Sequence, residues 1–232
     1  MKKVFKIFGF ILIVLTGGLY ISDYSYLLDG VFKIYLTGHK TAFLSDYNYF
    51  DNRTLAASEN PQAWPIHSEY NTISLSDDLE QHHKKTGTVA FLAIKNDSLY
   101  FEKYYDGYGV DSKSNSFSVA KSFVSALLGR AIMDGYIQDL DQPVKDFIPE
   151  LKGFYADQVT VGDLASMASG QRWEEKYYSP FSITAAAYFL KDLDAAILDQ
   201  PIEEAPGKSF IYKSGTTHLL GMVIAKATGK NL

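Results

Sequence analysis

The sequence predicts an α+β domain behind an N-terminal apolar segment, and three observations carry this prediction. Residues 88–105 have the pattern of a β-hairpin, and at least four helical patterns follow it along the chain. The first 21 residues combine three lysines with a continuous apolar run. No internal repeat competes with this interpretation.

Composition limits the possible functions. The chain has 232 residues, of which 47% are hydrophobic and 21% charged, a balance that suits one globular domain with a sizeable core. Its net charge of -5 gives no basis for a nucleic-acid partner. The absence of cysteine excludes disulfides and thiolate chemistry, and the five histidines show no metal-ligand spacing. We therefore expect no metal and no cofactor.

The N-terminal segment has the layout of an export signal. Three lysines precede the apolar run of residues 7–21, whose length lies between that of the apolar region of a signal peptide and that of a full membrane span. No clear small-residue cleavage site follows, so we favour an uncleaved signal-anchor over a cleaved signal peptide. Residues 1–22 would then hold the chain on the cytoplasmic membrane, with the remainder exported to the periplasm or another extracytoplasmic space.

An aromatic-rich lead-in, residues 23–70, comes next and is expected to pack on the domain through short helical pieces. A polar helix is predicted over residues 75–84, with Ser74 or Ser76 as its N-cap. Thr88–Ile94 and Ser98–Tyr105 are the predicted hairpin strands. Because the first strand is apolar on both faces, we expect it to lie inside a covered sheet.

The remaining elements are predicted to be helices. The first begins near Ser118 and ends near Gly135, with apolar residues at helical spacing. The later predicted helices cover Val144–Ile148, Thr160–Met167, Ile183–Leu198 and Thr217–Thr228.

Ser118 and Lys121 form a Ser-x-x-Lys motif at the start of the first of these helices. Three residues are about one helical turn, so an amine would lie within reach of a hydroxyl. A serine needs a base before it can act as a nucleophile, and a desolvated lysine can serve as one. The same four residues also fit an ordinary N-cap serine followed by a solvated lysine, so the motif needs support from the rest of the chain.

That support comes from several short blocks that occur in a fixed order. The blocks lie between about Thr88 and Leu232, and they are Phe101–Tyr104, Phe117–Ser122, Gly135–Ile137 with Asp141–Val144, Ile148–Leu151, Val159–Val161 with Met167–Gly170, Pro206–Tyr212 and Leu219–Gly221. On these blocks the chain resembles the serine β-lactamase-like family, which includes class C β-lactamases, penicillin-binding D,D-peptidases, related esterases and 6-aminohexanoate-dimer hydrolases.

The resemblance implies a β-lactamase/transpeptidase-like fold and acyl transfer at an ester, amide or β-lactam. Ser118 would be the nucleophile, with Lys121 and Tyr212 as base and proton relay. Tyr212 matches the tyrosine of the family's Tyr-x-Asn element, but Ser214 stands where many members have asparagine. A hydroxyl can donate to a substrate carbonyl, so Ser214 is a candidate substrate-binding residue, although it lacks the paired donor and acceptor of an amide. This departure weakens the case for β-lactam recognition.

The family's third element, a Lys-Thr-Gly or His-x-Gly on a later strand, has no counterpart after Tyr212. Lys85-Thr86-Gly87 and Lys213-Ser214-Gly215 resemble this element in residue type alone. The first precedes Ser118, and the second overlaps the tyrosine element. Residues 71–232 are therefore expected to be a partial hydrolase domain that holds only the N-terminal hairpin of the antiparallel sheet, with little or no turnover by itself. The alternative function is a truncated non-catalytic fragment or a cell-wall binding module on the same scaffold.

Overall fold

A computed structural model describes residues 2–231, which divide into two compact units. Residues 2–43 and 116–231 form the first unit, and Leu44–Asn115 form the second. The division runs through the predicted lead-in. Its first part joins the helical unit, whereas residues from 44 onward belong with the hairpin.

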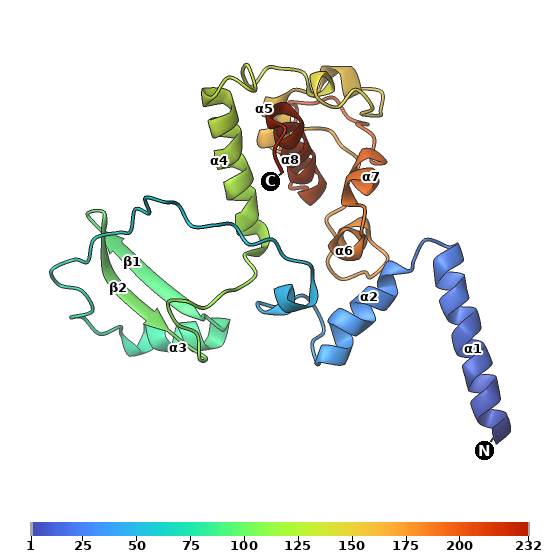
Figure 1. The fold of residues 1–232 in the computed structure, drawn as a ribbon, viewed down its shortest axis with the longest axis horizontal. Coiled ribbons are helices and arrows are strands. Elements are labelled where there is room, and N and C mark those ends of the chain that lie inside the picture. The colour runs from blue at the N-terminus through green and yellow to red at the C-terminus, as the bar shows by residue number, and fades with distance from the viewer. Residues whose placement is uncertain (1, 232) are drawn as a thin grey trace. The chain divides into compact units, whose positions relative to one another are not determined.

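The first unit is helical (Figure 1). Its C-terminal helix, α8, packs against α4, α5 and α7, and the short helix α2 packs against α6. The helices of this unit are α1 (Lys2–Ile21), α2 (Tyr26–Lys33), α4 (Ala120–Met133), α5 (Val161–Ala165), α6 (Ile183–Phe189), α7 (Leu193–Leu198) and α8 (Ser214–Thr228).

The core of the first unit is built around α8. Its side chains Leu219 and Val223 are completely buried, and they belong to one apolar cluster with Leu128 of α4, Leu164 of α5 and Ile197 of α7. Removal of such side chains from water supplies most of the stability of a domain. Because α4 and α8 share this cluster, the core fixes the start of α4 relative to the start of α8.

Gly215, in the first turn of α8, allows a very close contact in this core. A Cβ at this position would lie 2.4 Å from Cε3 of Trp173, closer than real carbon atoms approach. Only glycine therefore lets the indole lie directly against the helix backbone. This contact brings the segment after Trp173 to the N-terminal end of α8.

Hydrogen bonds between residues close in sequence fix several helix ends. Thr160 and Asp163 form a capping box at the start of α5, in which each side chain accepts a hydrogen bond from the other's backbone N–H. The predicted single helix over Ile183–Leu198 is wrong, because the chain is extended at Leu190 and divides it into α6 and α7. Asp192 caps the second helix by accepting from the N–H of Ala195, which stabilises the interruption.

The second unit contains α3 (Asp77–Thr86) and an antiparallel pair, β1 (Ala90–Lys95) and β2 (Ser98–Tyr104). Ser76 caps α3, and Asn96 and Asp97 both have positive φ in the tight turn between the strands. Within residues 2–231 the sheet has two strands, and Leu92 and Ile94 of β1 remain 43% and 40% exposed. The expectation that β1 is covered on both faces is therefore wrong for the described part of the chain, since β2 is its one partner strand there.

The N-terminal helix α1 is long and apolar enough to cross a membrane, and none of its residues is buried by the rest of the protein. A signal sequence at the N-terminus would satisfy the same criteria. Both alternatives considered for the N-terminal segment are consistent with this helix.

Candidate active site

Ser118 lies in a single 3₁₀ turn, Phe117–Val119, that leads directly into α4. Phe117 has a φ of +46°, in the left-handed region that bulky residues rarely occupy. Such a backbone costs about 1–3 kcal/mol and persists only where the surrounding structure holds it. The turn places Ser118 at the N-terminal end of α4, where the helix dipole favours negative charge.

Lys121 lies in the first turn of α4 and reaches back to Ser118. Its Nζ donates a hydrogen bond of 3.1 Å to Oγ of Ser118. The contact follows from the three-residue spacing, because residues three apart share one face of a helix. The structure therefore brings together the two side chains of the Ser-x-x-Lys motif.

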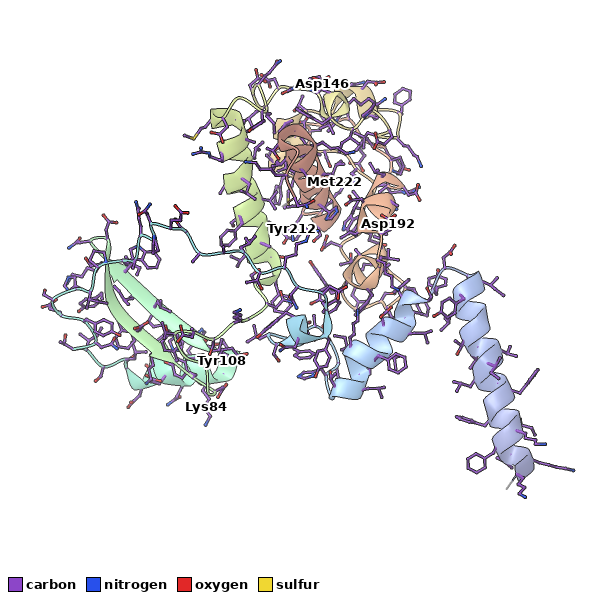
Figure 2. The ribbon with its side chains drawn as sticks, viewed as in Figure 1. Lys84, Tyr108, Asp146, Asp192, Tyr212 and Met222 are labelled. Carbon is purple, nitrogen blue, oxygen red and sulfur yellow. The ribbon has the colours of Figure 1, made fainter. Side chains whose placement is uncertain are left out.

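Tyr212 approaches the same oxygen from a distant part of the chain. Its hydroxyl donates a hydrogen bond of 2.7 Å to Oγ of Ser118, and the Nζ of Lys121 lies 5.0 Å from the centroid of its ring. Figure 2 shows Tyr212 beside the N-terminal end of α4. The ammonium group therefore lies close to both oxygens, where it would stabilise negative charge on either.

The extended residues before α8 hold Tyr212 in place. The N–H of Ile211 donates to the carbonyl of Met167 at 3.0 Å. On the other side of Tyr212, the buried Lys213 directs its Nζ to the carbonyl of Gln171 at 2.5 Å, and burial lowers the pKa of this lysine. Both neighbours of Tyr212 are thus attached to the chain around α5, while its ring remains at the surface.

Ser214, the first residue of α8, is bound to Glu175. Its backbone N–H and its hydroxyl each donate to the carboxylate at 2.7 Å. Trp173 and Tyr177 also donate to this carboxylate, at 2.7 Å and 2.5 Å. The hydroxyl proton of Ser214 is thus directed at Glu175, so a substrate at this position would meet the hydroxyl oxygen as an acceptor.

Electrostatics keep this donor and acceptor pattern constant near neutral pH. Burial acts to raise the pKa of Glu175, but the hydrogen bonds from Tyr177, Ser214 and Trp173 outweigh it and hold the pKa below its ordinary value of 4.5. Burial, followed by the bond to Glu175, raises the pKa of Tyr177 to about 12. The carboxylate therefore stays charged and the Tyr177 phenol stays protonated.

Sequence reasoning did not single out Glu175. It belongs to the run Trp173-Glu174-Glu175-Lys176, whose charges look like those of a solvated surface. Nothing in this run distinguishes Glu175 from Glu174, which pairs with Lys176. Only the close approach of Trp173 to α8 identifies the glutamate that reaches Ser214.

The described residues include no metal site. Within residues 2–231, no three histidine, aspartate or glutamate side chains gather in a way that could hold an ion. The candidate site consists of a hydroxyl, an amine, a phenol and a half-buried carboxylate.

Comparison with known proteins identifies relatives of this arrangement. The family model described as Beta-lactamase matches residues 76–232, which is more than half of the chain. A 6-aminohexanoate-dimer hydrolase of Paenarthrobacter ureafaciens is 29% identical in an alignment of 189 residues that covers 76% of this chain and 48% of that protein. The chain thus spans about half the length of this relative.

Solved structures share the fold. A Bacillus anthracis structure assigned by name as a 6-aminohexanoate-dimer hydrolase has a TM-score of 0.55 at 24% identity, over 66% of this chain and 43% of that one. A Bacteroides dorei structure assigned by name as a β-lactamase has a TM-score of 0.50 at 24% identity, over 67% and 46%. The small antiparallel sheet and the helices therefore follow the β-lactamase/transpeptidase-like arrangement.

Proposed function

Because the chain belongs to the beta-lactamase family of serine hydrolases, we propose that it is an exported hydrolase that forms an acyl-enzyme on Ser118. The observation that carries the proposal is the convergence of two groups on one oxygen. Lys121 Nζ and Tyr212 Oη lie 3.1 Å and 2.7 Å from Oγ of Ser118. A nucleophile within hydrogen-bond distance of a base, which is itself held by a third group, is the arrangement that covalent catalysis requires.

The proposed reaction has two half-reactions. Oγ of Ser118 attacks the carbonyl carbon of an ester or amide, and its proton passes to the deprotonated form of Tyr212 or Lys121. The same group then gives the proton to the departing alcohol or amine. In the second half, water attacks the carbonyl carbon of the acyl-enzyme and gives a proton to the same base, which passes it to Oγ of Ser118 as the serine ester bond breaks and the carboxylic acid leaves. The ammonium charge beside the ring and the positive end of α4 would favour the negative oxygens that develop.

Amides and esters are the substrates that the proposal favours. The Paenarthrobacter relative is named for hydrolysis of the 6-aminohexanoate dimer. At the position of Ser214 the chain lacks the amide group that many family members use, and the Ser214 hydroxyl is bound to Glu175. We therefore propose simple amides and esters as substrates in preference to β-lactams.

We also propose that the enzyme works outside the cytoplasm, attached to the cytoplasmic membrane. The support is α1, a helix of 20 residues that follows the N-terminus directly and is apolar enough to span a bilayer. The proposed organisation is a membrane segment over residues 1–22, a lead-in over residues 23–70 and a hydrolase domain over residues 71–232.

Labelling with a short alkyl fluorophosphonate tests the nucleophile directly, because the reagent needs an activated serine and no turnover. We expect an adduct that mass mapping locates on Ser118 and that Ser118→Ala abolishes. Ser125→Ala is the matched control, because Ser125 is an exposed serine on α4 two turns from Ser118. An unlabelled chain with an intact circular dichroism spectrum would instead support a non-catalytic scaffold.

A further inference from the structure

An apolar cavity lies beside the candidate active site, within the first unit. Its volume is 510 Å³, within the range of about 300–1,000 Å³ that is usual for small-molecule sites. Its walls are α2, the segment 35–42, Phe117, the loop 177–180 and α6. The proposed mechanism uses none of these walls.

Aromatic side chains are the largest single group in the lining. Among the described residues that line the cavity, Lys40 alone carries a charge. The rings come from three separate parts of the unit, and they include Tyr26, Tyr35, Phe117, Tyr177, Tyr188 and Phe189. Binding of an apolar ligand in a cavity of this composition is favourable, because apolar surface is removed from water. A charged ligand would find few partners for its charge there.

Two residues connect the cavity to the site. Phe117 lines the cavity and is bonded to Ser118, and its positive φ turns the chain between them. Tyr177 lines the cavity and donates its phenol proton to Glu175, which also holds Ser214. A substrate whose carbonyl carbon lies at Ser118 therefore has this cavity next to it.

The wall formed by α2 and the segment 35–42 comes from a part of the chain that the family match does not include. The match begins at residue 76, whereas α2 and the segment 35–42 precede it. Tyr26 of α2 is held against the opposite wall by a hydrogen bond of 2.9 Å from its phenol to the carbonyl of Pro180. The cavity thus joins part of the lead-in to residues of the matched region beside Ser118.

We propose that this cavity binds an extended acyl chain, the acyl part of the ester or amide that Ser118 attacks. The identity of the occupant follows from the apolar walls and from the position of α2. Four residues, Ser22–Ser25, separate α2 from the apolar helix α1. If α1 lies in a membrane, a wall of the cavity is held within a few residues of the lipid surface, where acyl chains are concentrated. This proposal rests on the proposed function, because it assumes that the carbonyl group of the substrate lies at Ser118.

Fluorophosphonates with ethyl, hexyl and decyl chains measure the effect of chain length on the rate of Ser118 labelling. We expect the second-order rate constant to rise about two- to fourfold for each methylene that the cavity takes up. Ala185→Trp, which places an indole in the cavity, should remove this dependence and leave ethyl labelling unchanged. Ala195→Trp is the matched control, because Ala185 and Ala195 occupy the same position after the N-caps of α6 and α7.

A second measurement does not depend on the nucleophile. A diazirine-bearing dodecanoic acid, photolysed with the full Ser118→Ala chain, should form adducts on Tyr188, Phe189 or the segment 35–42. Excess dodecanoate should displace the probe if free fatty acid fits the cavity, and lysophosphatidylcholine should displace it if a lipid-borne chain fits. Ala185→Trp should lose the adducts, and Ala195→Trp should keep them.

The results separate the two proposals. Ethyl labelling of Ser118 without any dependence on chain length, together with no adducts in the cavity, overturns the acyl site and leaves the hydrolase intact. Failure of every fluorophosphonate overturns the proposed function, while adducts in the cavity would still establish the acyl site. Adducts confined to α1 or to the second unit overturn the acyl site.

Discussion

The phenol of Tyr212 donates a hydrogen bond of 2.7 Å to Oγ of Ser118, although 94 positions separate the two residues in the sequence. Ser118 precedes α4 and Tyr212 precedes α8, and these helices share the core of the first unit. The contact is thus a consequence of helix packing. It gives the proposed nucleophile a partner that no local element supplies.

Tyr212→Phe should remove this hydrogen bond and keep the ring beside Lys121. General acid–base groups contribute about 10²–10⁴-fold to a reaction, so we expect labelling of Ser118 by ethyl fluorophosphonate to slow by about a hundredfold or more. Tyr136→Phe, which changes an exposed tyrosine of the same unit, should react like the parent chain. Equal rates for the two variants would exclude Tyr212 from proton transfer.

Lys121→Arg separates a requirement for positive charge from a requirement for a base. A guanidinium keeps the charge near the Tyr212 ring but does not lose its proton in proteins. We expect labelling to fall by about a hundredfold, because an amine at this position takes part in proton transfer. Lys226→Arg, in the last turn of α8, is the control. Full activity of Lys121→Arg would mean that charge alone is sufficient.

Glu175→Gln should disturb the start of α8, although the new side chain has nearly the same size as the glutamate. The carboxylate accepts from Ser214 twice and from Trp173 and Tyr177 once each, and an amide nitrogen cannot accept. We expect labelling of Ser118 to slow by about tenfold, since Ser214 and the neighbouring Tyr212 lose their fixed position. Glu174→Gln, which alters only the pair with Lys176, should leave the rate unchanged.

Glu175 also predicts the direction of a pH effect on stability. Its pKa in the folded protein lies below the ordinary value of 4.5, so the folded state favours the charged form. This contribution is complete above about pH 4.5 and is lost as the pH falls through the lower, folded-state pKa. Urea unfolding at several pH values should show a smaller acid-induced loss in Glu175→Gln than in the parent chain. An identical loss in both would exclude Glu175 as a source of the effect.

Gly215→Ala tests the contact that brings Trp173 to α8. The new Cβ would overlap the indole, so we expect a loss of about 1–3 kcal/mol in the free energy of unfolding, as for other overpacked cores. Gly129→Ala is the matched control, because that glycine is also helical and has nothing within 4 Å of the Cβ position. It should gain about 0.5–1 kcal/mol from helix propensity. Urea titration measures both changes.

Short-range signals control the local structure at several positions. The N-cap at Ser76, the capping box at Thr160 and the tight turn at Asn96-Asp97 depend on side chains within a few residues of each other. The prediction failed between α6 and α7, where an apolar helical pattern continues across Leu190. There, the local cap at Asp192 outweighs the periodicity.

Glu175 and the walls of the cavity could not be predicted in this way. Glu174 and Glu175 are equivalent in the sequence, and α2 belongs to a lead-in that carries no motif. Their positions depend on which side chain lies beside Gly215 and on how α2 packs against α6. No repeating pattern in the sequence predicts which distant segments pack against each other.

By itself, the sequence predicted the Ser118–Lys121 contact, because a three-residue spacing at a helix start places two side chains on one face. It also determined the apolar N-terminal helix and the family to which the chain belongs. The family resemblance implied that Tyr212 acts with Ser118, and the tertiary structure supplies the contact. The tertiary structure alone decided that Glu175 holds Ser214 and that a cavity lies beside Phe117. Each of these depends on helices distant in the chain being held together by a shared core, and no short stretch of sequence encodes that packing.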